Sequence, residues 1–144
     1  MHRLDQPASV EPPSPSTCVT LRAEARSVPV ARRLVRELLR TCETKLTDDV
    51  ADTASIVVTE LFTNAVVHSG ATTIRLSLQI MGENLWVEVA DDGLHRRRIH
   101  ERSAMWVDEN GRGLLLVREL SQAWGQDTSC LRGTRVWAAL ALTH

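Results

Sequence analysis

The sequence predicts an α+β domain, a two-layer sandwich in which a mixed, mostly antiparallel sheet carries helices on one face. Two stretches with helical periodicity come first, in residues 28–42 and 48–68. Two alternating stretches follow in residues 73–81 and 85–90, and they are typical of strands. A loop, a short helical stretch and two closing strands complete the chain. This order of elements predicts a mostly antiparallel sheet with helices on one face.

The N-terminal part is predicted to hold a tail, a strand and a helix. Residues 1–17 carry four of the five prolines, and such a segment buries too little apolar surface to offset its ordering, so we expect a flexible tail. Residues 19–23 alternate weakly and predict a short first strand. Ser27 can cap the following helix, with Pro29 in its first turn. Apolar residues recur there every three or four positions with arginines opposite, which indicates an amphipathic helix.

Turn-forming residues separate the predicted elements in the rest of the chain. The second helix is expected to start at Thr47 or Asp48 and to end at His68, before Ser69 and Gly70. A turn at residues 82–84 separates the two central strands. The remaining predicted elements are a loop over residues 91–111, a helix over 114–123, and strands over 124–127 and 134–142. The folded domain is expected to span residues 18–144.

Composition and charge exclude several classes of function. The net charge of −1 gives no electrostatic argument for direct nucleic-acid binding, although it does not exclude a small basic patch. The three cysteines are widely spaced and form no C-x-x-C pair, so a disulfide framework or a zinc site is not expected. The N-terminal segment is polar and lacks the apolar core of a signal peptide. The longest apolar run, residues 136–142, is too short to cross a bilayer. A cytoplasmic protein without membrane contact is therefore expected.

The second helix carries a polar stripe that could hold a ligand. Glu60, Asn64 and His68 are spaced by four residues, which places them on one face of the helix. A carboxylate and an amide one turn apart suit a hydrated divalent cation, because such ions prefer oxygen ligands. A solvated helix face with an internal hydrogen bond explains the same pattern. The stripe alone does not decide between these interpretations.

Two glycine-containing segments add to this pattern. A predicted strand runs directly into Asp91-Asp92-Gly93, which projects a carboxylate at the strand end and allows backbone to approach a planar ligand. Gly111-Arg112-Gly113-Leu114 opens a helix, where free backbone N–H groups favour phosphate. An acidic turn and a flexible helix entry are the simpler explanations. Neither a P-loop motif nor a dinucleotide G-x-G-x-x-G motif occurs in the chain.

In combination and order, these motifs resemble the ATP-binding domain shared by type II topoisomerases, certain chaperones and two-component histidine kinases, the Bergerat fold. The residues from Glu60 to Asn64 match its N box, 91–93 its first glycine box and 111–113 its second. Gly133-Thr134 stands where a short third box belongs. The resemblance covers roughly residues 19–143. The short loop between the boxes looks like the anti-sigma factor serine kinases of bacteria.

The resemblance implies a role for each motif. Asn64 would hold Mg²⁺, and Glu60 would be the base that orients or deprotonates an attacking hydroxyl. Asp91 would accept a hydrogen bond from the adenine amine, supported by Thr134. A lid over residues 94–110 would close on the nucleotide. The further nucleotide-binding positions would be Gly93, Gly111, Arg112, Gly113 and Leu114.

The resemblance also implies partners. It suggests a bacterial serine/threonine kinase that uses ATP and Mg²⁺ to phosphorylate an anti-anti-sigma (antagonist) protein, with a sigma factor as a second partner. Relatives pair through the first strand and helix, so a homodimer is a further possibility. An ATP-binding interaction module without catalysis is the alternative function. The sequence departs from the family pattern at Leu94-His95, which follows Gly93 where the family usually has a further glycine, and this bears on lid mobility and phosphate contact.

Overall fold

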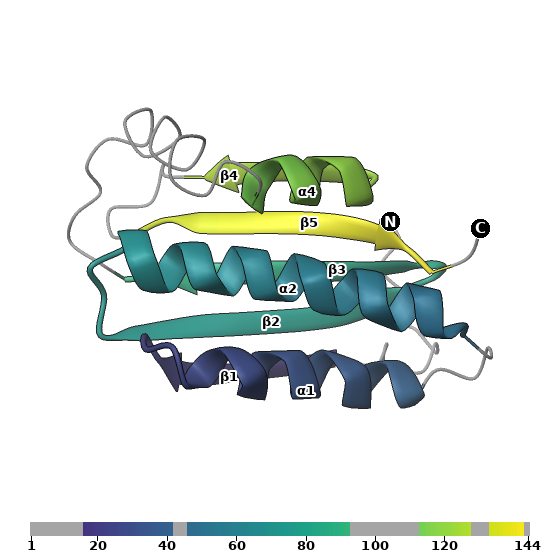
Figure 1. Cartoon of the computed structure of the whole chain (residues 1–144), viewed down its shortest axis with the longest axis horizontal. Helices are drawn as coiled ribbons and strands as arrows, with labels where there is room; N and C mark the ends of the chain where they lie inside the picture. The colour runs from purple at the N-terminus through teal and green to yellow at the C-terminus, as the bar shows by residue number, and fades with distance from the viewer. Residues whose placement is uncertain (1–15, 42–45, 93–112, 128–132, 143–144) are drawn as a thin grey trace, which may run out of the picture.

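The computed structural model describes residues 16–41, 46–92, 113–127 and 133–142. Within these ranges the chain forms five strands and three helices. In chain order they are β1 (Ser16–Arg22), α1 (Ser27–Arg40), α2 (Asp48–His68), β2 (Thr73–Met81), β3 (Asn84–Asp91), α4 (Gly113–Leu120), β4 (Ala123–Asp127) and β5 (Arg135–Ala141) (Figure 1). The expected α+β sandwich is confirmed.

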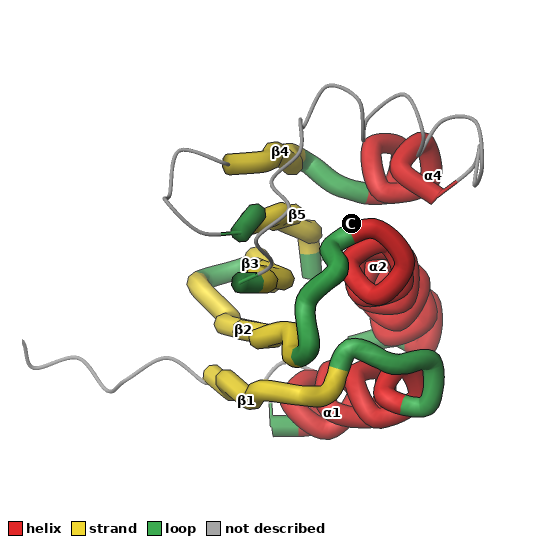
Figure 2. Tube along the Cα trace, turned by 90° about the vertical axis from the view of Figure 1, so that its left-hand side faces the viewer, coloured by secondary structure: helices red, strands yellow, loops and turns green. Residues whose placement is uncertain are grey.

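The five strands form one sheet in the order β1-β2-β3-β5-β4, and every pairing between the described strands is antiparallel. The sheet is therefore more regular than the mixed sheet that the sequence predicted. Viewed along the strands, all three described helices lie on one side of the sheet (Figure 2). The tail is expected to end at residue 17, but β1 already begins at Ser16. Residues 1–15 lie outside the described ranges.

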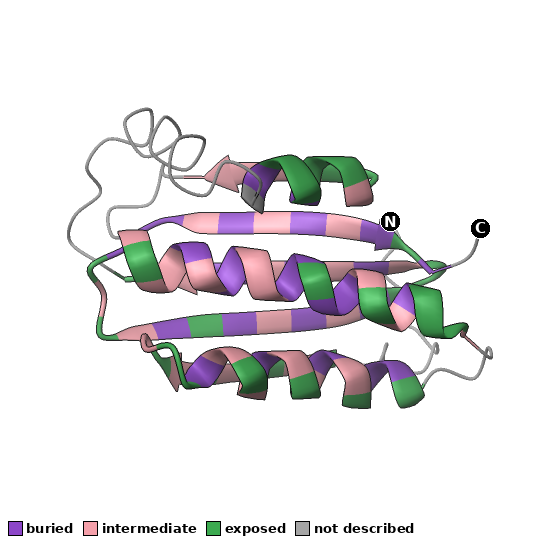
Figure 3. Cartoon of the chain, in the orientation of Figure 1, coloured by how far each residue is buried: buried purple, intermediate pink, exposed green. Residues whose placement is uncertain are grey.

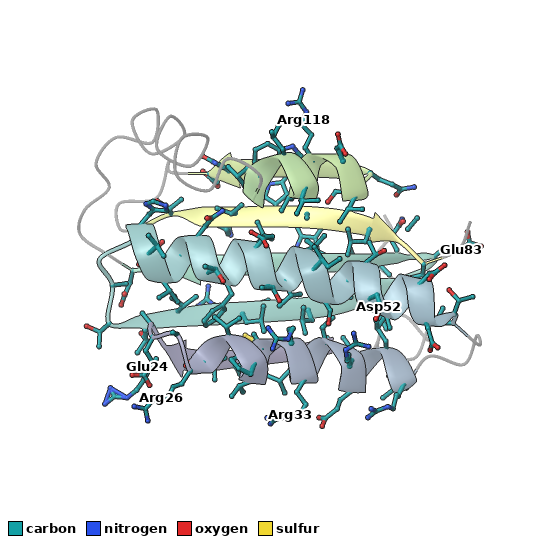
Figure 4. The ribbon with its side chains drawn as sticks, in the orientation of Figure 1. Glu24, Arg26, Arg33, Asp52, Glu83 and Arg118 are labelled. Carbon is teal, nitrogen blue, oxygen red and sulfur yellow. The ribbon has the colours of Figure 1, made fainter. Side chains whose placement is uncertain are left out.

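The core lies between the sheet and α2. Phe62, Val57 and Val58 are fully buried on α2, and Leu76 and Val87 face them from β2 and β3. Burial alternates along β2 and β3 (Figure 3), and the buried positions are apolar. This alternation is what the period of a strand requires when only one face is covered. Arg33 on α1 and Arg118 on α4 point away from the core (Figure 4).

Several helix ends differ from the predictions, and α1 ends at Arg40 rather than residue 42. Ser27 does not cap α1: Arg26 occupies the cap position without a side-chain hydrogen bond, and Ser27 is buried in the first turn. At α2, Thr47 is the cap, and its hydroxyl accepts a hydrogen bond from the Val50 N–H at 3.3 Å. The last helix ends at Leu120 rather than residue 123, because Ala123 already pairs with Ala139 in the sheet.

Length and composition would allow α2 to cross a membrane. Its apolar residues are instead the core of the domain, with Leu61 and Phe62 almost fully buried. A core helix of this kind passes the same test, so we assign α2 to the interior of the domain.

Candidate functional site

The polar stripe on α2 faces different surroundings along its length. Asn64 is only 3% exposed, whereas Glu60 and His68 are half-buried. The Nδ2 atom of Asn64 is buried and has no hydrogen-bond partner. An unpaired buried amide costs about 1–3 kcal/mol, so this side chain is suited to hydrogen-bond a ligand or a water molecule in the site. The simpler interpretation of the stripe, a solvated helix face, is wrong for Asn64.

Asp91 and Thr134 meet where β3 ends and β5 begins. The Asp91 N–H donates a hydrogen bond to the Thr134 carbonyl at 3.0 Å. Gly133 precedes this contact with a φ of 75°, a conformation that L side chains rarely adopt. A Cβ at Gly133 would overlap the Asp91 carbonyl oxygen and stand 2.6 Å from its carbon. The glycine is therefore needed for the two strands to approach here.

A small cavity of about 10 Å³, room for about one water molecule, joins these side chains. Its lining comes from α2, β3, β5 and the residues next to them, and it combines polar side chains with an apolar floor: Leu61, Asn64, Ala65, His68, Ser69, Val89, Asp91, Thr134 and Val136. In Figure 1 the end of α2 and the start of β5 lie at the same end of the domain. The cavity thus brings together Asn64, Asp91 and Thr134. Glu60 lies one turn along α2 and is not part of the lining.

The remaining predicted site residues fall partly within the described ranges. Gly113 is the first residue of α4, and the Leu114 side chain is buried at 9% exposure. β4 runs antiparallel to β5 and begins at Ala123, far from the start of β5. Since α4 packs on α2 and shortly precedes β4, it begins at the end of the domain that carries the cavity. Gly93, Gly111, Arg112 and the expected lid at residues 94–110 lie outside the described ranges.

Burial changes the acidity of the carboxyl group on α2. Desolvation raises the pKa of Glu60 above its ordinary value, because burial disfavours the charged form. A carboxyl with a raised pKa is better suited to accept and release a proton near neutral pH than an ordinary surface carboxyl. Glu60 therefore combines a raised pKa with a position one helical turn from Asn64.

The described residues contain no cluster of three or more His, Cys, Asp or Glu side chains able to enclose a metal ion. Such a cage is not what Mg²⁺ requires in nucleotide sites, where it keeps several waters and binds one or two protein oxygens plus phosphates. The buried Asn64 amide fits this need, since a half-turn of its side chain presents oxygen instead of nitrogen to the cavity.

A wider hollow of about 310 Å³ lies on the other side of the Asp91–Thr134 contact. Arg75 and Arg135 contribute to its lining, but Arg135 is already paired with Asp127 at 2.9 Å. Neither Asn64 nor any other α2 residue reaches it. We therefore place the candidate site in the smaller cavity beside α2.

Sequence reasoning missed the apolar floor of the cavity and the place of Ser69. Val89 and Val136 belong to different strands, and no pattern in the chain relates them. The sequence predicts Ser69 just after the end of a helix, and the Ser69 Oγ accepts a hydrogen bond from the Ala71 N–H at 3.0 Å in the turn that follows. Only the fold shows that the residue also borders the site.

An antiparallel sheet with helices on one face and a cavity between its central strands and a core helix is consistent with the ATP-binding fold that the sequence resembles. The model of the histidine kinase-like ATPase domain matches residues 21–139, most of the chain. The chain therefore belongs to the histidine kinase-like ATPase family, which binds ATP and includes kinases and ATPases. The search of curated proteins found no match.

Proposed function

We propose that this protein is a bacterial, cytoplasmic anti-sigma-type serine/threonine kinase that uses Mg-ATP to phosphorylate an anti-anti-sigma protein. The observation that carries the proposal is Glu60, a half-buried carboxyl with a raised pKa, one helical turn from the buried and unpaired Asn64. A domain that only binds ATP has no need of a base at this position. Family membership supports the nucleotide, and a sigma factor is the proposed second partner.

The chemistry assigns a task to each side chain. Asp91 accepts from the adenine amine with Thr134 beside it, and the start of α4 faces the phosphates through free N–H groups. Mg²⁺, held by Asn64, would neutralise phosphate charge. Glu60 takes the proton from a serine or threonine hydroxyl as its oxygen bonds to the γ-phosphorus. The bond from that phosphorus to the β–γ bridging oxygen breaks, and ADP leaves.

The test has two stages. Calorimetry with ATP and Mg²⁺ first measures binding to the isolated protein. Partners cross-linked in the source cell are then purified and incubated with the protein and γ-labelled ATP. Label on a partner serine or threonine supports the kinase. ATP binding without labelling of any captured partner favours the non-catalytic interaction module, and absence of ATP binding contradicts both.

Asn64→Ala is expected to weaken binding of Mg-ATP much more than binding of metal-free ATP, because the lost group is the proposed metal ligand. Calorimetry with and without Mg²⁺ measures both affinities. Asn84→Ala, at the far end of β3, is the matched control and should change neither. Equal losses for Asn64→Ala under both conditions would place Asn64 away from the metal.

Asp91→Asn is expected to lower ATP affinity roughly ten- to a hundredfold, because two donors would then face each other, a mismatch of about 1–3 kcal/mol. The neighbouring, exposed Asp92→Asn is the control, since it makes the same charge change outside the cavity. Thermal stability should change little in either variant. Normal ATP binding by Asp91→Asn would rule out the adenine contact.

A further inference from the structure

The face of the sheet opposite the helices carries two stacked tryptophans. The rings of Trp86 on β3 and Trp137 on β5 lie 4.8 Å apart at an interplanar angle of 10°. Trp137 in turn covers Gly125 of β4, where an added Cβ would stand 2.8 Å from its ring. No described residue covers this side of the sheet (Figure 2). Trp86 and Trp137, together with Gly125 under the Trp137 ring, form a continuous surface across β3, β5 and β4. We call this surface the tryptophan step.

The surroundings of the tryptophan step are small and apolar on one side and charged on the other. Trp86 pairs in register with Ala139, and Ala139 with Ala123. Toward the nucleotide end, Glu88 contacts Arg135 at 3.6 Å and accepts a hydrogen bond from the Trp86 indole N–H at 3.4 Å. The apolar area around the step consists of the two tryptophans and the alanines beside them, and Met81 of β2 is exposed on the same face of the sheet.

The small area of the tryptophan step argues against a second copy of the chain as its binding partner. A stable protein interface buries about 800 Å² on each partner. Two tryptophans have about 150–250 Å² each, and both are already half-buried. A short extended peptide needs much less surface, and aromatic grooves are the usual receptors of proline-rich segments in the polyproline II conformation.

The chain supplies such a segment at the right place. Residues 7–15 contain Pro7, Pro12, Pro13 and Pro15, and they lead directly into β1. The register aligns Ser16 with Gln79, and Gln79 with Trp86, in one row across the sheet. Two strand spacings of about 4.8 Å separate Ser16 from Trp86. At about 3.1 Å per residue, three to four residues of polyproline II would cover this distance, and Pro13 and Pro12 stand three and four positions before Ser16.

We propose that the proline-rich N-terminal segment, residues 7–15, docks on the tryptophan step of its own domain, with Pro12 and Pro13 against Trp86 and Trp137. The segment is too polar to form a hydrophobic core of its own. Docking on an aromatic surface that the domain already provides does not need such a core. A tether of a few residues also gives it an effective concentration of the order of millimolar, enough for a weak contact. The contact is independent of ATP and of any kinase activity.

The test uses the full-length protein labelled with ¹⁵N and the indole N–H signals of its four tryptophans. Pro12→Asp/Pro13→Asp places charges over the aromatic rings, and Pro7→Asp/Ala8→Asp adds the same charges farther along the segment. The first double variant should shift the Trp86 and Trp137 signals but not that of Trp124, and the second should leave all three in place. Single Trp→Phe variants assign the signals.

Three outcomes would overturn the proposal. The Trp86 and Trp137 signals could stay unmoved in Pro12→Asp/Pro13→Asp, or shift equally in both double variants. The wild-type signals could also move to the positions of the variant on dilution, which would make a second copy the occupant. Positions that do not change on dilution support an intramolecular contact. ATP affinity, measured in parallel, should be the same in all variants, so a failure of the nucleotide site would not be mistaken for loss of docking.

Discussion

Replacing Glu60 with Gln is expected to lower phosphate transfer to the captured partner by about 10²-fold or more, the scale of a lost general base. Gln keeps the size and hydrogen-bonding capacity of the side chain but cannot take a proton. Because Glu60 does not line the cavity, ATP affinity should stay close to that of the wild type. Glu37→Gln, on the exposed side of α1, is the control and should transfer normally.

The pH profile separates a base from a residue that only positions others. Burial raises the pKa of Glu60, so the wild-type rate should rise with pH through that raised pKa as the carboxylate forms. The rising limb should be absent in Glu60→Gln. Unchanged transfer in this variant, or an identical limb, would remove Glu60 from the mechanism.

The same pKa shift has a consequence for stability. A raised pKa means that the folded state holds its proton to higher pH than the unfolded chain does. The contribution of Glu60 to stability is therefore greatest below its ordinary pKa and is lost as the pH rises through the raised value. Glu60→Gln removes this dependence, so the variant should be at least as stable as the wild type at neutral pH. Low transfer in Glu60→Gln would then not result from unfolding.

Periodicity predicted the fold well because each element has one covered face. β2 was predicted with its observed bounds, since Ile74, Leu76 and Leu78 alternate with polar residues and face the helices. The N-terminus of α1 was predicted less well. Ser27 has the chemistry of a cap, but tertiary packing buries it and moves the cap position to Arg26. A local pattern cannot reveal that competition.

The candidate site was only partly accessible from the sequence. The spacing of Glu60, Asn64 and His68 placed them on one helix face, but it could not show that Asn64 alone is buried there. The contact of Asp91 with Thr134 joins residues more than forty positions apart, and it follows from the pairing of β3 with β5. The tryptophan step depends on the same pairing. Contacts of this kind are set by register, which no short motif contains.

Gly133→Ala is expected to have the second large effect. At a φ of 75° an alanine costs about 1–2 kcal/mol, and its Cβ would also overlap the Asp91 carbonyl oxygen. Relief requires the end of β3 to move away from the start of β5, which breaks the hydrogen bond from Asp91 to Thr134. We therefore expect ATP affinity to fall about tenfold or more, a change of at least about 1.4 kcal/mol, together with a lower free energy of unfolding.

Gly82 provides a control that separates backbone strain from the clash. Its φ is 61°, and an added Cβ would meet no atom within 4 Å. The free energy of unfolding of Gly82→Ala should therefore fall only by the conformational cost of about 1–2 kcal/mol, and its ATP affinity should not change. Urea unfolding and calorimetry of both variants measure the difference. If the two variants lost equal stability and both bound ATP normally, the close approach at Gly133 would have no part in shaping the nucleotide site. A selective loss of ATP binding in Gly133→Ala would instead tie that site to the place where the two strands meet.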